Sequence, residues 1–341
     1  MFHDGSFDDG LLDDERALTR ADPVLRDLAE SGARVRMDTH TAGEVVATLG
    51  NDADQRPRAV VAAGQPARLL RAVLEPVCPV PFLAWPGPGL PGWAGSLDLV
   101  VVLGAPDGPA AHSAAAEAVR RGCPLLLVAP ATSALAEVAA SRWTTVLPTA
   151  TADPLATSVV ALQALAALGL APPVDSEEVA RALDSVAVGC SPFHDLGSNH
   201  AKQLASGLGD TVPLVWGGSV LAARAARRWA EALRRVSARP ALAAEAEDLV
   251  AVLQASPQRD VFADPFEDPV GGPSPFLVLL DDRVEAPTVR VDRSHLLGAA
   301  ETQGVRHDDV VSVEGGEVAR YASLVATGSY AAAYLAIGLG R

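Results

Sequence analysis

Short, continuous apolar runs alternate with helical segments between residues 59 and 147, and this alternation constrains the fold more than any other feature. The runs are Ala59–Ala63, Val80–Ala84, Leu97–Leu103, Leu125–Ala129 and Thr144–Leu147. Strands that are covered by helices on both faces are apolar along their whole length, as in a parallel sheet. We therefore expect a doubly wound parallel-sheet α/β unit in this part of the chain.

A second set of strands and helices follows a helical connection. Its predicted strands are Val212–Trp216, Phe276–Leu280 and Asp309–Val313, and its long helices are Val220–Arg235 and Ala319–Ile337. In both sets the first strand runs into a glycine and then a helix, at Gly64 in the first and at Gly217-Gly218 in the second. The sequence therefore predicts two copies of one α/β fold.

The expected domain boundaries follow from these patterns. We predict an N-terminal helical segment and linker (1–56), a first α/β domain (57–150), connecting helices (151–195) and a second α/β domain with a C-terminal helix (196–341). The apolar run Val159–Leu170 is interrupted by Gln163 and is shorter than the ~20 residues that a membrane span needs. We expect it to form a buried helix.

Charge and cysteine content exclude several classes of protein. The chain has 27 basic and 42 acidic residues, a net charge of −15, whereas nucleic acids and anionic membranes favour positive surfaces. We expect neither as a partner. Because Met1–Asp14 is acidic rather than basic, we expect a cytoplasmic protein without a signal peptide. The scattered Cys78, Cys123 and Cys190 are expected to be buried free thiols.

Ligands of doubly wound sheets bind beyond the carboxyl ends of the strands, near helix N-termini. Three loops qualify: Gly64–Ala67, Gly104–Gly108 and Gly217–Ser219. The first two contain proline, which lacks an N–H donor, and Asp107 would repel a phosphate, so tight structural turns are the simpler interpretation there. The candidate ligand-binding residues are Gly64, Gln65, Gly104, Asp107, Gly217, Gly218, Ser219 and His194.

Candidate acid–base groups are few. His200, Glu245 and Glu247 are the catalytic candidates, although a capping histidine and solvated carboxylates are the simpler interpretation. The acidic pairs Glu177-Glu178 and Asp281-Asp282 are expected to be solvated. Asp264, Glu267 and Asp268 of the Pro- and Gly-rich loop Phe262–Pro275 match no calcium motif. The spacing G-x-G-x-x-G occurs at Gly87–Gly92, but in a proline-rich segment (GPGLPG) that does not lead directly into a predicted helix. The sequence contains no G-x-x-x-x-G-K-[ST] motif and no H-x-x-x-H pair, so we expect no cofactor and no metal.

Three stretches of the second half carry a family resemblance. They are Asn199–Ala205 (NHAKQLA), Val212–Gly217 (VPLVWG) and Ala225–Trp229 (AARRW), and the ending Gly328–Ala336 adds to them. The chain resembles the bifunctional phosphoglucose/phosphomannose isomerases, and within them the divergent TobH-like proteins. The resemblance implies two sugar-isomerase (SIS) domains of flavodoxin-like strand order, a homodimer, and a sugar phosphate as ligand.

The departures from that family bear on activity. At the family's two phosphate loops the chain has Ala62–Pro66 and Leu103–Gly108, without a hydroxyl, and no arginine occurs in Thr149–Pro154. The position of the family's catalytic glutamate falls in Arg234–Ala238, which contains no glutamate. The position of its ring-opening histidine falls in Pro240–Val250, which contains no histidine.

The resemblance and its departures predict a degenerate SIS protein that binds a sugar phosphate-like ligand or regulates sugar metabolism. The alternative is an active aldose–ketose sugar-phosphate isomerase, for glucose 6-phosphate or mannose 6-phosphate, with a rearranged site built from His200, Glu245 and Glu247.

Overall fold

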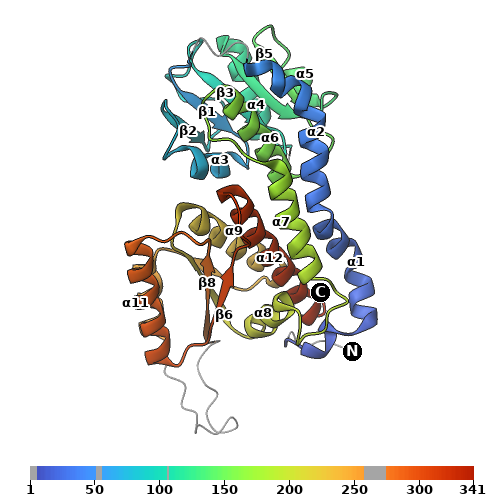
Figure 1. Cartoon of the computed structure of the whole chain (residues 1–341), viewed down its shortest axis with the longest axis vertical. Helices are drawn as coiled ribbons and strands as arrows, with labels where there is room; N and C mark the ends of the chain where they lie inside the picture. Colours follow the sequence, from blue (N-terminus) through green and yellow to red (C-terminus); the bar gives the residue numbers. More distant parts are fainter. Residues whose placement is uncertain (1–5, 51–55, 106, 257–273) are drawn as a thin grey trace. The chain divides into compact units, whose positions relative to one another are not determined.

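Two compact units make up the chain in the computed structural model (Figure 1), which describes residues 6–50, 56–105, 107–256 and 274–341. The first α/β unit is Glu30–Arg181, and the second combines Met1–Ala29 with Ala182–Arg341. The Phe262–Pro275 loop, with its three acidic residues, lies almost wholly outside the described residues.

The first α/β unit contains a parallel sheet in the order β2-β1-β3-β4-β5. Its strands are β1 (Val60–Ala63), β2 (Phe82–Trp85), β3 (Leu99–Leu103), β4 (Leu125–Ala129) and β5 (Thr144–Pro148). Every residue of β1, β3 and β4 is buried, which is why these segments are continuous apolar runs. The doubly wound fold and the flavodoxin-like strand order are thus confirmed.

Helices of the first unit are α2 (Ser31–Leu49), α3 (Ala67–Leu74), α4 (Pro109–Arg121), α5 (Ala134–Val138) and α6 (Pro154–Ala167). Gly122 ends α4 with φ +66°, a left-handed conformation that glycine adopts without strain. The middle of α6 is buried around its whole circumference, so the apolar run that begins at Val159 forms a buried helix as expected, although the helix ends at Ala167 rather than at Leu170. No helix in the described part of the chain is long and apolar enough to cross a membrane.

A four-stranded parallel sheet in the order β7-β6-β8-β9 forms the centre of the second unit. The strands are β6 (Val212–Gly217), β7 (Leu242–Ala243), β8 (Pro275–Asp281) and β9 (His307–Val311). The order repeats that of the first four strands of the other sheet, which supports the expectation of two copies of one fold.

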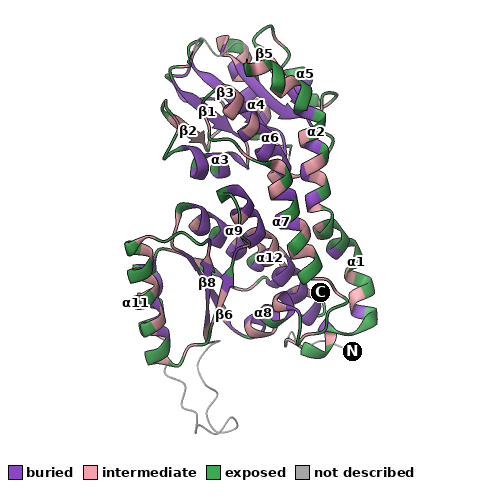
Figure 2. Ribbon diagram, in the orientation of Figure 1, coloured by how far each residue is buried: buried purple, intermediate pink, exposed green. Residues whose placement is uncertain are grey.

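The other elements of the second unit are helices. They are the 3-10 turn η1 (Asp9–Leu12), α1 (Glu15–Ala29), α8 (His200–Leu208), α9 (Val220–Ser237), α10 (Ala246–Gln254), α11 (Pro287–Gln303) and α12 (Glu317–Gly338), while α7 (Ser176–Gly189) contains the boundary between the units. Figure 2 shows buried α9 and α12 and a largely exposed α11. The compact units also divide the N-terminal segment, because α2 packs on α6 whereas α1 packs on α12.

Packing of α9 against α12 explains two of the sequence stretches that carry the resemblance. The Trp229 indole is buried, and its Nε1 donates a hydrogen bond to the Leu324 carbonyl oxygen at 2.7 Å. A Cβ at position 328 would overlap this indole, so the close approach of the helices requires glycine there. These residues hold the core of the second unit.

Candidate functional site

The carboxyl edge of the second sheet brings the Gly217–Ser219 loop next to Asp282. Gly217 lies opposite Leu280 in the register of β6 and β8, so the residues that follow the two strands are neighbours. The Ser219 hydroxyl donates a hydrogen bond to Asp282 Oδ2, and Ser219 Oγ accepts one from the Ala222 amide at 2.9 Å. The hydrogen-bonding capacity of Ser219 as a donor is therefore used inside the protein.

Asp282 lies where an anionic ligand of this loop would be stabilised. Its side chain is bonded to the N-cap residue of α9, and a helix N-terminus favours a negative charge. Only 7% of Asp282 is exposed, so the prediction that the pair Asp281-Asp282 is solvated is wrong for this residue. The prediction failed because the partner, Ser219, is far away in sequence.

Glycines of the same loop serve close packing. A Cβ on Gly217 would overlap the backbone of Ala222, and a Cβ on Gly218 would overlap Val289 and Trp216. The space beside both glycines is thus filled by the protein itself.

Glu245 and Glu247 lie at this same edge. They follow β7, whose last residue, Ala243, pairs with Val215 of β6. Glu245 is the N-cap residue of α10, is exposed, and lies 3.3 Å from Arg227 Nη2. Both carboxylates are accessible to a ligand at this edge.

His200 lies elsewhere in the second unit. Its Nε2 is 3.2 Å from both carboxylate oxygens of Asp308, and this hydrogen bond raises the pKa of His200 above its usual value. Asp308 pairs with Val278, and Asp282 lies four positions further along, or about 13 Å along a strand. His200 is therefore not brought together with Ser219. His194 is exposed, in the loop before α8.

The loops of the first unit are tight turns. Gly64 has φ +105°, and a Cβ there would overlap the Leu103 carbonyl oxygen. A Cβ on Gly104 would lie 2.9 Å from the Ala129 and Leu135 side chains. Gln65 connects β1 to α3, and its side chain has no hydrogen bond within the described ranges. These positions fit the simpler, structural interpretation of the two loops.

Asp107 occupies the region before α4. Its Oδ1 lies 2.8 Å from His112 Nε2 on that helix, and the N-cap residue Gly108 provides no side-chain cap. An acidic side chain thus stands at the N-terminus of α4.

Asp38 was not predicted as a functional residue, yet it organises the loop after β5. Its carboxylate accepts hydrogen bonds from the Ala150 and Thr151 amides, both at 2.8 Å, and from Thr151 Oγ1 at 2.7 Å. The side chain is fully buried, and burial raises the pKa of Asp38. No local sequence signal identifies this contact, because Asp38 comes from the distant helix α2.

The Asn199–Ala205 stretch holds the N-terminal segment in place. Asn199 Oδ1 accepts from the Lys202 amide at 3.2 Å and so caps α8. Lys202, the sole lysine of the sequence, is completely buried, and its Nζ donates to Asp13 Oδ1 at 2.7 Å. The stretch therefore has a structural role here.

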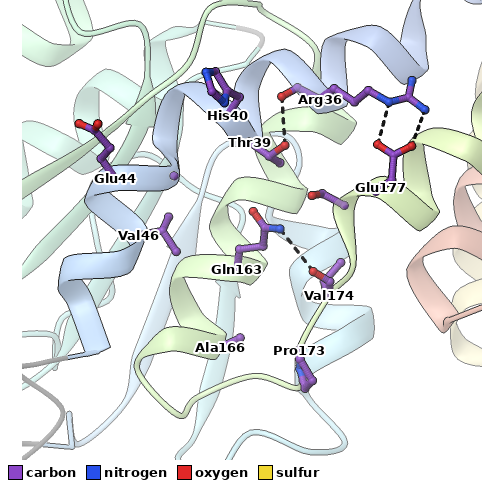
Figure 3. Close-up of a pocket in the computed structure, with 12 residues that line it drawn as sticks. Arg36, Thr39, His40, Glu44, Val46, Gln163, Ala166, Pro173, Val174 and Glu177 are labelled. Carbon is purple, nitrogen blue, oxygen red and sulfur yellow. Dashed lines mark hydrogen bonds and ion pairs between the residues drawn. The ribbon is translucent and has the colours of Figure 1, made fainter.

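A separate open hollow of about 960 Å³ lies on the first unit (Figure 3). It is bounded by α2, by α6 and by residues 173–177, and Arg36 bonds both Glu177 oxygens at 2.8 and 2.9 Å across it. None of the predicted site residues lines this hollow.

Comparison with known proteins identifies the second unit. Residues 197–341 match the family model described as the bacterial phospho-glucose isomerase C-terminal SIS domain. Most of the second unit is thus similar to an SIS domain. The expected relationship of the chain to SIS proteins of the phosphoglucose isomerase type is thereby confirmed. No curated protein sequence matches the chain.

Solved structures share the fold over nearly the whole chain. Tagatose-6-phosphate ketose/aldose isomerase from Escherichia coli has a TM-score of 0.65 at 13% identity, covering 94% of this chain and 93% of that one. The C-terminal domain of glucosamine-fructose-6-phosphate aminotransferase from Francisella tularensis has a TM-score of 0.63 at 10% identity, covering 93% and 96%. At these identities the similarity is one of fold, and it extends to the first unit as well.

Proposed function

We propose that this SIS-domain protein does not isomerise sugar phosphates and instead binds a sugar phosphate-like ligand weakly, or regulates a partner in sugar metabolism. The observation that carries the proposal is the position of Asp282. Its carboxylate accepts a hydrogen bond from the Ser219 hydroxyl at the N-terminus of α9, where a phosphate would otherwise be bound. A second anion placed there would be repelled.

Two features of the first unit support the proposal. Asp107 stands before α4, and Asp38 already binds the two backbone amides and the hydroxyl of the loop after β5. In that loop the chain supplies its own carboxylate, in a segment where the family pattern has an arginine. Each of these loops thus has a carboxylate of the chain itself at the place where an anionic ligand would bind: Asp282 in the second unit, and Asp107 and Asp38 in the first.

The position of His200 also does not suit acid–base catalysis at the Ser219 loop. Aldose–ketose isomerisation requires a base within hydrogen-bond reach of the proton that moves between C1 and C2. The histidine with a raised pKa, His200, bonds Asp308, whose register partner Val278 lies about 13 Å along the strand from Asp282.

A coupled assay of glucose 6-phosphate and mannose 6-phosphate isomerisation tests the proposal. We expect no turnover above the uncatalysed rate, together with intact folding by circular dichroism. Robust turnover of either compound would refute it. Thermal unfolding against a panel of hexose phosphates follows, since a ligand at 100 times its Kd stabilises by about 2.7 kcal/mol.

An active isomerase with a rearranged site is the second candidate. It is favoured by Glu245 and Glu247, which are exposed at the same edge as Ser219. If turnover is found, Glu245→Ala and His200→Ala variants assign the roles. Unchanged activity in both variants would remove these residues from the mechanism.

Location and assembly complete the proposal. We infer a cytoplasmic homodimer whose partner is a small molecule, with no role in nucleic-acid or membrane binding. The strongly acidic composition supports the last point. Sedimentation of the full chain tests the dimer, and a monomer at high concentration would contradict it.

A further inference from the structure

A half-enclosed apolar pocket lies at the amino edge of the first sheet, opposite the edge that carries the candidate loops. Its volume is about 260 Å³. The walls come from residues at or just before the first positions of β1, β3, β4 and β5, and from the ends of α2 and α6. It lies entirely within the first unit and shares no residue with the Figure 3 hollow.

The wall of the pocket is mainly apolar, and two backbone amides beside it are already paired. Leucines form most of its wall, and the Leu99 and Leu125 amides donate to carbonyl oxygens of the sheet edge at 2.9 Å each. A cavity of about 150 Å³ accepts a benzene ring, so this one has room for a ring with a side chain or for a medium-length alkyl chain.

Two large apolar side chains of the wall remain exposed to solvent. Leu97 is 68% exposed and Trp143 is 50% exposed, and both line the pocket. Exposed apolar groups around a concave surface are typical of binding sites. A ligand in the pocket would cover part of both side chains.

Two arginines lie in or next to the wall of the pocket, and their positive charge selects the kind of ligand. The Arg142 guanidinium stacks on the Trp143 ring, with its carbon 4.5 Å from the ring centroid, and Arg142 has no ion pair within the described part of the chain. Arg56 also lines the pocket. In a protein of net charge −15, guanidinium groups beside an apolar pocket favour an anionic head group.

We propose that this pocket binds a small amphipathic carboxylate, with an apolar body in the pocket and its carboxylate at Arg142. The ligand class is a medium-chain or aryl-alkyl monocarboxylate. This site is independent of the carboxyl edges of both sheets, so it does not depend on the proposed function.

Calorimetric titration of the full chain with octanoate and with octan-1-ol tests the proposal. We expect saturable binding of octanoate and weaker binding of octan-1-ol, which has the same chain without the charge. Exposed position 97 supplies a matched pair of variants that leaves the core intact. Both variants lose the same apolar contact, so octan-1-ol should bind the two with similar affinity, whereas octanoate should bind Leu97→Lys more tightly than Leu97→Glu by at least about 1.4- to 5-fold.

A third variant fills the pocket. Leu168→Trp enlarges a partly buried wall residue and should abolish binding of both probes while the far-UV circular dichroism stays unchanged. Failure of octanoate to bind the wild-type chain would overturn the proposal. Equal affinity of octanoate and octan-1-ol, or equal octanoate affinity in Leu97→Glu and Leu97→Lys, would also overturn it.

Discussion

Removing Asp13 should destabilise the second unit much more than removing its partner Lys202. The Lys202 side chain is 0% exposed, whereas that of Asp13 is 46% exposed, and 2.7 Å separates the charged atoms. In Asp13→Ala the buried ammonium keeps two contacts with described residues, the Pro192 carbonyl oxygen at 3.2 Å and the Tyr334 ring at 5.5 Å. Breaking a buried ion pair from one side costs about 3–5 kcal/mol, and these two contacts place the expected loss near 3 kcal/mol.

The Lys202→Met variant leaves a half-exposed carboxylate, rather than a buried ammonium, without its partner. The methionine side chain is apolar and of similar length, and the Asp13 carboxylate can be hydrated because it is almost half exposed. We expect a loss of about 1 kcal/mol or less. We therefore predict that Asp13→Ala loses more unfolding free energy than Lys202→Met.

Urea denaturation followed by circular dichroism and tryptophan fluorescence measures both losses, and the double variant completes a cycle. The Lys202 hydrogen bond lowers the pKa of Asp13, so its stabilisation is present above the ordinary carboxyl pKa and is lost as the pH falls through the lowered value. That acid-side loss should disappear in Asp13→Ala. Equal losses in the two single variants, or a neutral Asp13→Ala, would refute the reasoning.

Two further predictions concern packing and pH. Gly328→Ala should cost about 1–3 kcal/mol by overpacking against Trp229, whereas Gly298→Ala, with open space on helix α11, should stabilise by about 0.5–1 kcal/mol; equal urea midpoints would contradict this. Because Asp308 raises the pKa of His200, the pair stabilises fully below the ordinary histidine pKa and loses its effect as the pH rises through the raised value. In Asp308→Asn the urea midpoint should depend less on pH across that range. An unchanged pH profile of the midpoint would argue against a stabilising His200–Asp308 pair.

The parallel sheets could be predicted from the sequence because burial on both faces leaves a continuous apolar run. β3 and β4 are completely buried, and the predicted runs contain them. β7 was not predicted, since a strand of two residues at a sheet edge leaves no such run.

The candidate site could be predicted only in part. The loop Gly217–Ser219 was found from the strand–glycine–helix pattern. Its partner Asp282 was not, because a contact between residues so distant in sequence depends on the register of β6 and β8. Asp38 escaped prediction for the same reason, since its partners lie more than one hundred residues away. A single sequence carries no local signal for such contacts.

The most direct test of the account is calorimetric titration of glucose 6-phosphate into the wild-type chain and into Asp282→Asn, an isosteric change. A carboxylate about 5 Å from a phosphate costs about 3 kcal/mol per unit charge at an effective dielectric constant of 20. The account predicts weak or undetectable binding to the wild-type chain and binding tightened roughly 100-fold in the variant. Tight binding to the wild-type chain that Asp282→Asn leaves unchanged would contradict it.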